Sequence, residues 1–390
     1  MLSQVAVELT KKLEAGKQCQ DEQKSADAIQ IYEYIIAFKF PSEDDINDDS
    51  LRAKEQAAYR LGQIFSELSL FDQLVDLTKQ ILPLYSDLPK SKTGKIIRTL
   101  FDQCLRFPGR NRYEPLIELS KHIIEWCVKE SRSFLRMKLE NKLADLYFKQ
   151  GKCSEALQIL NKLLFELKKK DDKQLILESQ LVESKVYHAL ENLPKAKSSL
   201  TSVKTVANSI YVVPMLQAEI DFMSGLISAD ERDYNTAYSY FYETFEGYRS
   251  MNQNEMAANA FKFMLFSKVM SKQPDDAINL INSSVSLKFQ SRHVEAMKQV
   301  ALASKQQNLL MFEKCKQVYD VELLEDPVIK RHFNYLYNTL LEDNLKKIIE
   351  PYSEVQIDFV AESIGLPMER ILQKLSEMIL DEVIDGTLDQ

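Results

Sequence analysis

The sequence predicts an almost entirely helical protein in which pairs of helices stack in series. Its 390 residues include only 9 Gly and 11 Pro, about 5% together against a usual share of about 12%, so turn-dense all-β folds and Gly-rich cofactor loops are not expected. Apolar residues that recur at helical spacing, and an alanine that returns about every 40 positions, are the other two observations. With 45% hydrophobic residues, the chain can fold around a sizeable core.

The first predicted helix occupies the N-terminal residues 1–17. Glu8, Lys11, Lys12 and Glu14 interrupt its hydrophobic residues, a pattern typical of an amphipathic helix and not of a signal peptide. No stretch reaches the roughly 20 apolar residues that span a bilayer, so no membrane segment is expected. The five cysteines are scattered and lack Cys-x-x-Cys spacing, which favours a reducing compartment, cytoplasmic and nuclear.

The clearest repeat lies at residues 143–160. Two amphipathic helices meet there around Gly151, and Ala156 stands near the start of the second. The alanine returns in steps of 40, 41 and 40 residues, at Ala196, Ala237 and Ala277. Counting backwards gives the equivalent positions Pro115, Leu74 and Ala28. A small residue here lets the second helix of a pair cross its partner closely, and about seven such pairs are predicted.

This unit resembles a tetratricopeptide repeat lengthened from about 34 to about 40 residues. Helix pairs of that kind cannot bury their apolar faces alone, so they stack into a right-handed α-solenoid. We expect this TPR-like solenoid to occupy residues 1–325. Within it, the acidic residues 40–49 are expected to form a solvated connection between the first helices.

The repeat pattern ends near Asp326. Two further helices are predicted at about 328–342 and 343–349, before Pro351 stops the helical run. The residues that follow have a different order of elements, so a separate C-terminal part is expected to begin here.

Two short helices and a strand are predicted to close the chain. Ser353 and Gln356 match a capping box for the first helix, which ends at Gly365. The second helix has an apolar stripe made of Met368, Leu372, Leu375 and Ile379. Residues 383–388 are predicted to form a short strand. The order helix, turn, helix, strand is that of a winged helix, here expected in residues 326–390.

A helical-repeat array that leads into a winged helix resembles the proteins with a PCI domain. A closer resemblance, to the family of the proteasome lid subunit called non-ATPase subunit 11, lies in Lys168–Lys173, Leu181–Leu190, Asn192–Lys197, Thr236–Tyr248, Ile349–Ser353 and Leu375–Leu380. It is strong from Ser131 to Gln390 and weaker in the N-terminal third. The resemblance implies that the solenoid from about residue 215 forms the helical half of the PCI module.

The resemblance implies a structural subunit of the 26S proteasome lid in ubiquitin-dependent protein degradation. Its implied partners are other PCI lid subunits, an outer-ring subunit of the core particle and a proteasomal ATPase subunit. The family offers no catalytic residues, so no enzyme activity, cofactor or metal is expected. In the family, a return strand completes the wing and a long C-terminal helix follows it. This chain ends at Gln390, so we expect an incomplete wing and a trimmed chain.

Two alternatives stay open. One is the equivalent PCI scaffold subunit of the signalosome, which periodicity does not separate from the lid subunit. The other, less favoured, is a PCI-type nucleic-acid adaptor. Residues 350–390 hold ten acids against Arg370 and Lys374, a local net charge of -8, and such a surface repels phosphate. The whole chain also has a net charge of -8, so neither nucleic acid nor an anionic membrane is an expected partner.

The candidate interface residues are Val383, Ile384, Leu388, Tyr240 and Tyr248. The first three would form a strand with an unpaired edge that pairs with another chain. Between residues 238 and 248, a second set is predicted to share a core-facing helix surface: Tyr238, Phe241, Tyr242 and Phe245. Tyr240 and Tyr248 point elsewhere in this prediction. The histidines His122, His188, His293 and His332 show no metal-binding pattern.

Overall fold

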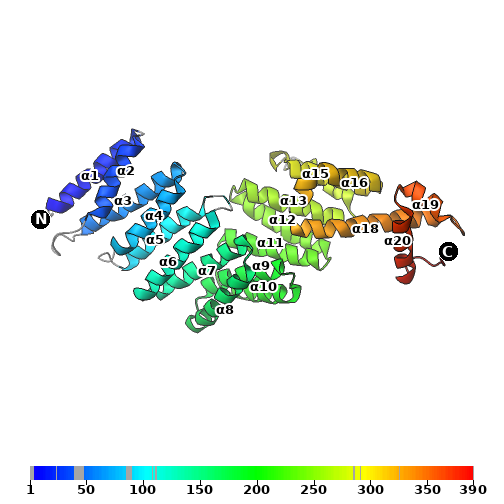
Figure 1. The fold of residues 1–390 in the computed structure, drawn as a ribbon, viewed down its shortest axis with the longest axis horizontal. Helices are drawn as coiled ribbons and strands as arrows, with labels where there is room; N and C mark the ends of the chain where they lie inside the picture. Colours follow the sequence, from blue (N-terminus) through cyan, green and yellow to red (C-terminus); the bar gives the residue numbers. More distant parts are fainter. Residues whose placement is uncertain are drawn as a thin grey trace. The chain divides into compact units, whose positions relative to one another are not determined.

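The computed structural model describes residues 4–22, 24–38, 48–84, 90–107, 109, 112–283, 286–289, 291–324 and 326–389. Every regular element in these ranges is a helix (Figure 1), so the predicted helical fold class is confirmed. By packing, the chain divides into two compact units, unit 1 (Met1–Leu190) and unit 2 (Glu191–Gln390). The predicted boundary at residue 326 falls at the start of a long helix and stays a prediction.

Unit 1 is a series of helix pairs. Its helices are α1 (Gln4–Asp21), α2 (Ser25–Ala37), α3 (Asp48–Glu67), α4 (Phe71–Leu84), α5 (Lys90–Leu105), α6 (Tyr113–Lys129), α7 (Ser133–Gln150), α8 (Cys153–Lys170) and α9 (Lys173–Ala189). Successive pairs pack against each other. The contacts of α1 with α3, of α3 with α5 and of α7 with α9 show this. The acidic residues expected to connect the first helices lie mostly outside the described residues.

The predicted repeat positions lie in the core of unit 1. Ala28 on α2, Leu74 on α4 and Ala156 on α8 are all fully buried, as is expected where a second helix crosses its partner closely. Leu116, next to the predicted position Pro115, is buried on α6. The step of about 40 residues therefore marks the second helix of each pair.

Unit 2 continues the same construction and then changes. Its helices are α10 (Leu193–Ala207), α11 (Pro214–Asp230), α12 (Tyr234–Ser250), α13 (Asn254–Met270), α14 (Pro274–Ile281), the 3-10 helix η3 (Ser286–Phe289), α15 (Arg292–Gln306), α16 (Leu309–Val318), α17 (Asp320–Leu324), α18 (Pro327–Ile349), α19 (Ile357–Ile364) and α20 (Met368–Leu380). Ala196, Ala237 and Ala277 are fully buried. They occupy α10, α12 and α14, as the repeat predicts.

The core of unit 2 is aromatic where α11, α12 and α13 pack. Phe222 on α11 contacts Phe263 on α13 edge-on, with ring centres 5.2 Å apart. Phe241 on α12 lies equally close to Phe263. At Gly225 on α11, an added Cβ would lie 2.6 Å from the Phe241 ring. A glycine inside this helix is therefore explained by the close approach of α12.

The start of the C-terminal part differs from the prediction in two respects. Residues 327–349 form one continuous helix, α18, and not two, because no Gly or Pro interrupts them and the Asn344 side chain only donates back to the Leu340 carbonyl at 2.8 Å. Helix α19 begins at Ile357 with Gln356 as its N-cap residue, so the capping box at Ser353 does not form. Gly365 ends α19 with a left-handed φ of 78°, as predicted.

The last helix is rotated relative to the predicted stripe, and no strand follows it. On α20 the buried residues are Ile371, Leu375 and Met378, so only Leu375 of the predicted set is buried. Leu372 and Ile379 are half-buried, and Met368 is exposed. After α20, the Val383 amide donates to the Met378 carbonyl at 2.8 Å, which caps the helix. The described residues 383–389 are not in a strand, because a strand needs the hydrogen bonds of a neighbour and they find none.

Candidate functional site

The predicted interface residues of α12 have different surroundings. Tyr240 is half-buried, and Lys204 Nζ donates to its hydroxyl at 3.1 Å. Tyr248 is only 6% exposed, so the prediction that it points away from the core is wrong. Residue 248 lies about two turns after Phe241, and that spacing returns it to the same face of the helix. Tyr242, which was predicted to face the core, is exposed instead.

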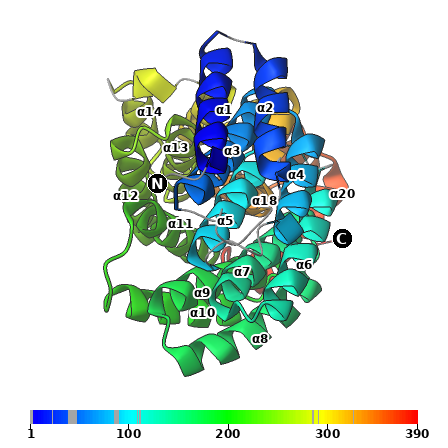
Figure 2. The ribbon, with the colours of Figure 1, turned by 90° about the vertical axis from the view of Figure 1, so that its left-hand side faces the viewer.

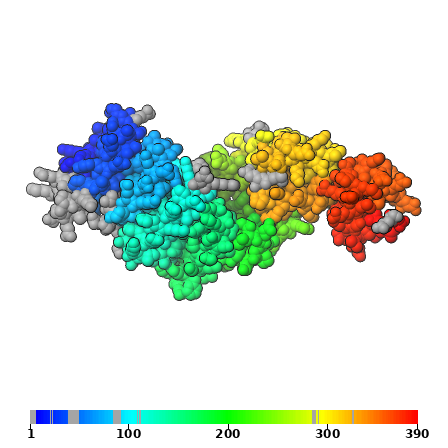
Figure 3. Space-filling model, viewed as in Figure 1, coloured from blue at the N-terminus to red at the C-terminus, as the bar shows by residue number. Residues whose placement is uncertain are grey.

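The predicted interface residues after α20 are accessible. Val383 and Leu388 are each 37% exposed, and Ile384 is half-buried. These residues belong to the C-terminal segment, residues 350–389, whose surface is drawn in red at one end of unit 2 in Figure 3. Four other large apolar side chains of the same segment are exposed: Tyr352, Phe359, Met368 and Leu380. The role of the predicted residues at an interface stays a prediction.

The two basic side chains of α20 are engaged by other helices of unit 2. Lys374 Nζ lies 2.8 Å from Glu342 on α18 and 3.1 Å from Glu377 on α20 itself. The Arg370 guanidinium lies 4.9 Å from the ring centre of Tyr337 on α18. Tyr337 in turn donates to Glu313 on α16 at 3.0 Å. These contacts hold α20 against α18, and the two carboxylates neutralise the charge of Lys374.

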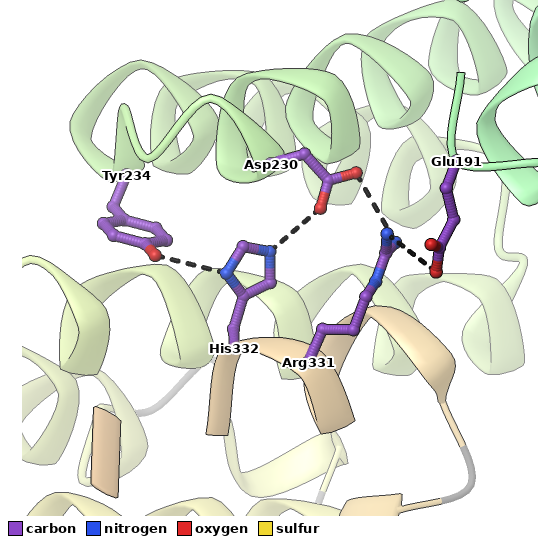
Figure 4. Close-up of polar contacts among 5 residues, drawn as sticks. All are labelled: Glu191, Asp230, Tyr234, Arg331 and His332. Atoms are coloured by element: carbon purple, nitrogen blue, oxygen red, sulfur yellow. Dashed lines mark hydrogen bonds and ion pairs between the residues drawn. The ribbon is translucent and has the colours of Figure 1, made fainter. Parts of the chain in front are cut away.

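A polar junction fixes the first turns of α18 to the turn between α11 and α12 (Figure 4). His332 on α18 lies between two partners, with Nε2 3.1 Å from Asp230 Oδ1 and Nδ1 3.2 Å from the Tyr234 hydroxyl. The adjacent Arg331 extends the junction, with Nη2 3.6 Å from Asp230 Oδ2 and Nη1 3.5 Å from Glu191 Oε1. Asp230, Tyr234 and His332 are largely buried, so the contacts among these three are shielded from water.

The hydrogen-bonding groups of the junction can be matched donor to acceptor. An ionised Asp230 only accepts, so His332 Nε2 carries a hydrogen. Burial raises the pKa of Tyr234 to about 12, so its hydroxyl stays protonated at neutral pH and donates to His332 Nδ1. With the hydrogen on Nε2, the ring donates to Asp230 and accepts from Tyr234, an assignment that rests on the network itself.

A second set of contacts fixes α18 beside the polar junction. Lys262 on α13 is largely buried, and its Nζ pairs with Asp326, the N-cap residue of α18. The Arg232 guanidinium lies 4.6 Å from the ring centre of Tyr335. Together with the junction, these contacts fix the orientation of α18 relative to α11–α13. They thereby position the α19–α20 segment that follows α18.

We expect Tyr234→Phe to destabilise unit 2 by about 1–3 kcal/mol at pH 8, because the buried His332 Nδ1 loses its donor. The folded state raises the pKa of Tyr234, so the stability from this tyrosine is present below pH 10 and is lost as the pH rises to about 12. The variant should therefore lose less stability than the wild type between pH 8 and pH 11.

Urea unfolding of both proteins at pH 8 and pH 11 measures this difference. Tyr211→Phe, at an exposed position, is the control, and an unchanged pH dependence in Tyr234→Phe would contradict the assignment.

The reactive side chains of the described residues do not gather as metal ligands. The described residues contain no group of His, Cys, Asp and Glu side chains that could hold a metal ion. Burial raises the pKa of Cys104 to about 12 and that of Cys127 to about 11, which makes both thiols poor nucleophiles at neutral pH. In the same ranges, no helix has the length and apolar character needed to cross a membrane.

Sequence reasoning did not find the polar junction. His332 lies 102 residues from Asp230 and 98 from Tyr234, so no local spacing connects them. The only local signal is the pair Arg331 and His332 in the first turns of a helix that begins with Pro327. That pattern is common on solvent-exposed helices and does not identify buried partners.

Comparison with known proteins gives the family. Residues 9–150 match the family model of the 26S proteasome regulatory subunit RPN6 N-terminal domain, and residues 316–390 match that of the PCI domain. The 26S proteasome non-ATPase regulatory subunit 11 of Dictyostelium discoideum is 42% identical over 379 residues, covering 97% of this chain and 88% of that protein. The rpn6 protein of Schizosaccharomyces pombe is 40% identical over 364 residues, covering 93% and 85%. RPN6 of Saccharomyces cerevisiae is 37% identical over 389 residues, covering 97% and 89%. The chain belongs to the family of the 26S proteasome regulatory subunit RPN6, also named non-ATPase regulatory subunit 11.

Proposed function

We propose that the chain is a non-catalytic structural subunit of the proteasome lid. It bridges the regulatory particle to the core particle and to neighbouring PCI subunits during ubiquitin-dependent protein degradation. The observation that carries this proposal is the match of an RPN6 N-terminal model and a PCI model within one chain, with relatives covered over most of their length. The expected locations are the cytoplasm and the nucleus.

The proposed mechanism is bridging through separate contacts. Unit 1 would contact an outer-ring subunit of the core particle and a proteasomal ATPase subunit, while the α19–α20 segment would contact other PCI subunits. Each contact can be weak, because the first raises the effective concentration of the second. The polar junction supports this role, since it fixes the helix that leads to the α19–α20 segment.

Two alternatives receive less support. The relatives bear the name of the 26S proteasome subunit, which favours the lid over the signalosome. A nucleic-acid adaptor would need several free cations on the α20 surface, yet this helix has only Arg370 and Lys374, and Lys374 pairs with Glu342. Few counterions would be released on such a surface, so its affinity for nucleic acid would be low.

The test is affinity purification of the tagged protein from native lysate, followed by mass spectrometry and a peptidase assay on the eluate. We expect lid, ATPase and core-particle subunits with peptide-cleaving activity. A Val383→Glu/Leu388→Glu variant should recover neighbouring PCI subunits at least about tenfold less well, a loss of about 1.4 kcal/mol in binding free energy, and should keep the wild-type melting temperature. Tyr211→Glu, at an exposed apolar position elsewhere in unit 2, is the matched control. Recovery of signalosome subunits alone would contradict the proposal.

A further inference from the structure

A groove of about 730 Å³ runs between α2 and α4 of unit 1. The two helices lie side by side in the views of Figures 1 and 2, and they contact each other directly. The floor of the groove is apolar and consists of Ile29, Ile36, Phe65, Leu70 and Leu77. Ile29 and Leu70 are half-buried, so the floor keeps apolar surface that a partner could cover.

The polar rim of the groove has one sign of charge. Glu33 on α2 and Asp76 on α4 line it together with Gln30, Gln73 and Gln80. No Lys, Arg or His is among its described lining residues. Both carboxylates are exposed, and neither has an ion-pair partner among the described residues. An apolar floor between unpaired carboxylates fits a segment that has an apolar stripe and flanking cations.

We propose that the groove between α2 and α4 binds an amphipathic helix of a partner protein, with apolar residues on the floor and Lys or Arg beside Glu33 and Asp76. Recognition of a helix in a groove uses apolar anchors at positions i, i+3, i+4 and i+7, with the charged flanks giving orientation. This inference does not rest on the proposed lid function, because it follows from the groove alone.

The chemistry of the rim argues against two other occupants. A second copy that docked through the same face would bring its own acidic helix, because α2 contains Asp27 and Glu33 but no Lys or Arg. A small molecule would need an enclosed site that buries most of its surface, whereas the rim residues Glu33, Gln73 and Asp76 are exposed. A helix covers an open groove with one face and leaves its other face in water.

The experiment uses the full chain and two fluorescent, stapled helical peptides as probes. Both have Leu at i, i+3, i+4 and i+7, and their flanks are all Lys in one and all Glu in the other. By fluorescence anisotropy at constant ionic strength, we expect the wild type to bind the Lys peptide at least about tenfold more tightly than the Glu peptide. In Glu33→Lys/Asp76→Lys the preference should reverse. In Ile29→Gln both affinities should fall.

The matched control is Asp27→Lys/Asp72→Lys, which makes the same change in net charge on the same two helices at residues that do not line the groove. This control should keep the preference for the Lys peptide, and all variants should keep the wild-type circular dichroism and melting temperature. Equal binding of the two peptides by the wild type would overturn the proposal. So would a reversed preference in the control, which would indicate a response to net charge. Self-association of the wild type that Glu33→Lys/Asp76→Lys abolishes would also overturn it, since the occupant would then be a second copy.

Discussion

Replacing Phe241 by alanine is expected to destabilise unit 2 by about 3–5 kcal/mol. The ring is completely buried on α12 and lies 5.6 Å from the ring centre of Phe222 and 5.2 Å from that of Phe263. Gly225 also fits against it, so three helices meet at this side chain. Its removal leaves a cavity that helices fixed by many other contacts cannot fill. The melting temperature of unit 2 should fall by about 6–20 °C, measured by calorimetry.

Tyr242→Ala is the control for this prediction. Tyr242 follows Phe241 on the same helix but is 47% exposed, so its replacement should change the stability by less than about 1 kcal/mol. If both variants lost the same stability, the aromatic cluster would not be the core of unit 2.

Asp326→Ala is expected to destabilise unit 2 by about 3–5 kcal/mol, more than the removal of its partner. Lys262 has a side chain that is only 8% exposed, whereas that of Asp326 is 34% exposed. Removal of the acid leaves an ammonium group that is buried and unpaired, which is the expensive outcome for a buried ion pair. Removal of the lysine leaves a carboxylate that water reaches. Lys262→Met, which keeps the apolar volume, should therefore change the stability by less than about 1.5 kcal/mol.

The comparison of the two single variants with the double variant decides this prediction. Asp326→Ala/Lys262→Met should be about as stable as Lys262→Met alone, because the acid matters only when the buried ammonium is present. The measurement is the free energy of unfolding of unit 2 in urea for all four proteins. Additive losses in the double variant, or a larger loss in Lys262→Met than in Asp326→Ala, would contradict the ion pair as the main anchor of the α18 N-terminus.

The sequence predicted the helical repeat and one helix end correctly. The alanine step of about 40 residues placed Ala156, Ala196 and Ala237 where second helices cross their partners. Gly365 was predicted to end a helix, and it does so in the left-handed conformation. Both features can be predicted from the type of residue and its spacing along the chain.

Besides the predicted strand, the capping box and the division of α18, two wrong predictions concern which face of a helix is buried. On α20 the predicted stripe through Met368 and the observed one through Ile371 have the same period, so spacing alone does not choose between them. Contact with α18 decides it. Tyr248 was predicted to point away from the core-facing surface of its helix. The packing of α11 against α12 buries it.

The sequence by itself determined the helical repeat, the change of pattern near Asp326 and, through long matching segments, the family resemblance. Only the tertiary structure decided the contacts that hold α18. Those contacts join His332 to Asp230 and Tyr234, and Lys262 to Asp326, pairs that are 64 to 102 residues apart in sequence. The physical reason is that a local pattern sets the period of a helix, whereas the partners of a buried polar group depend on which distant helices pack beside it.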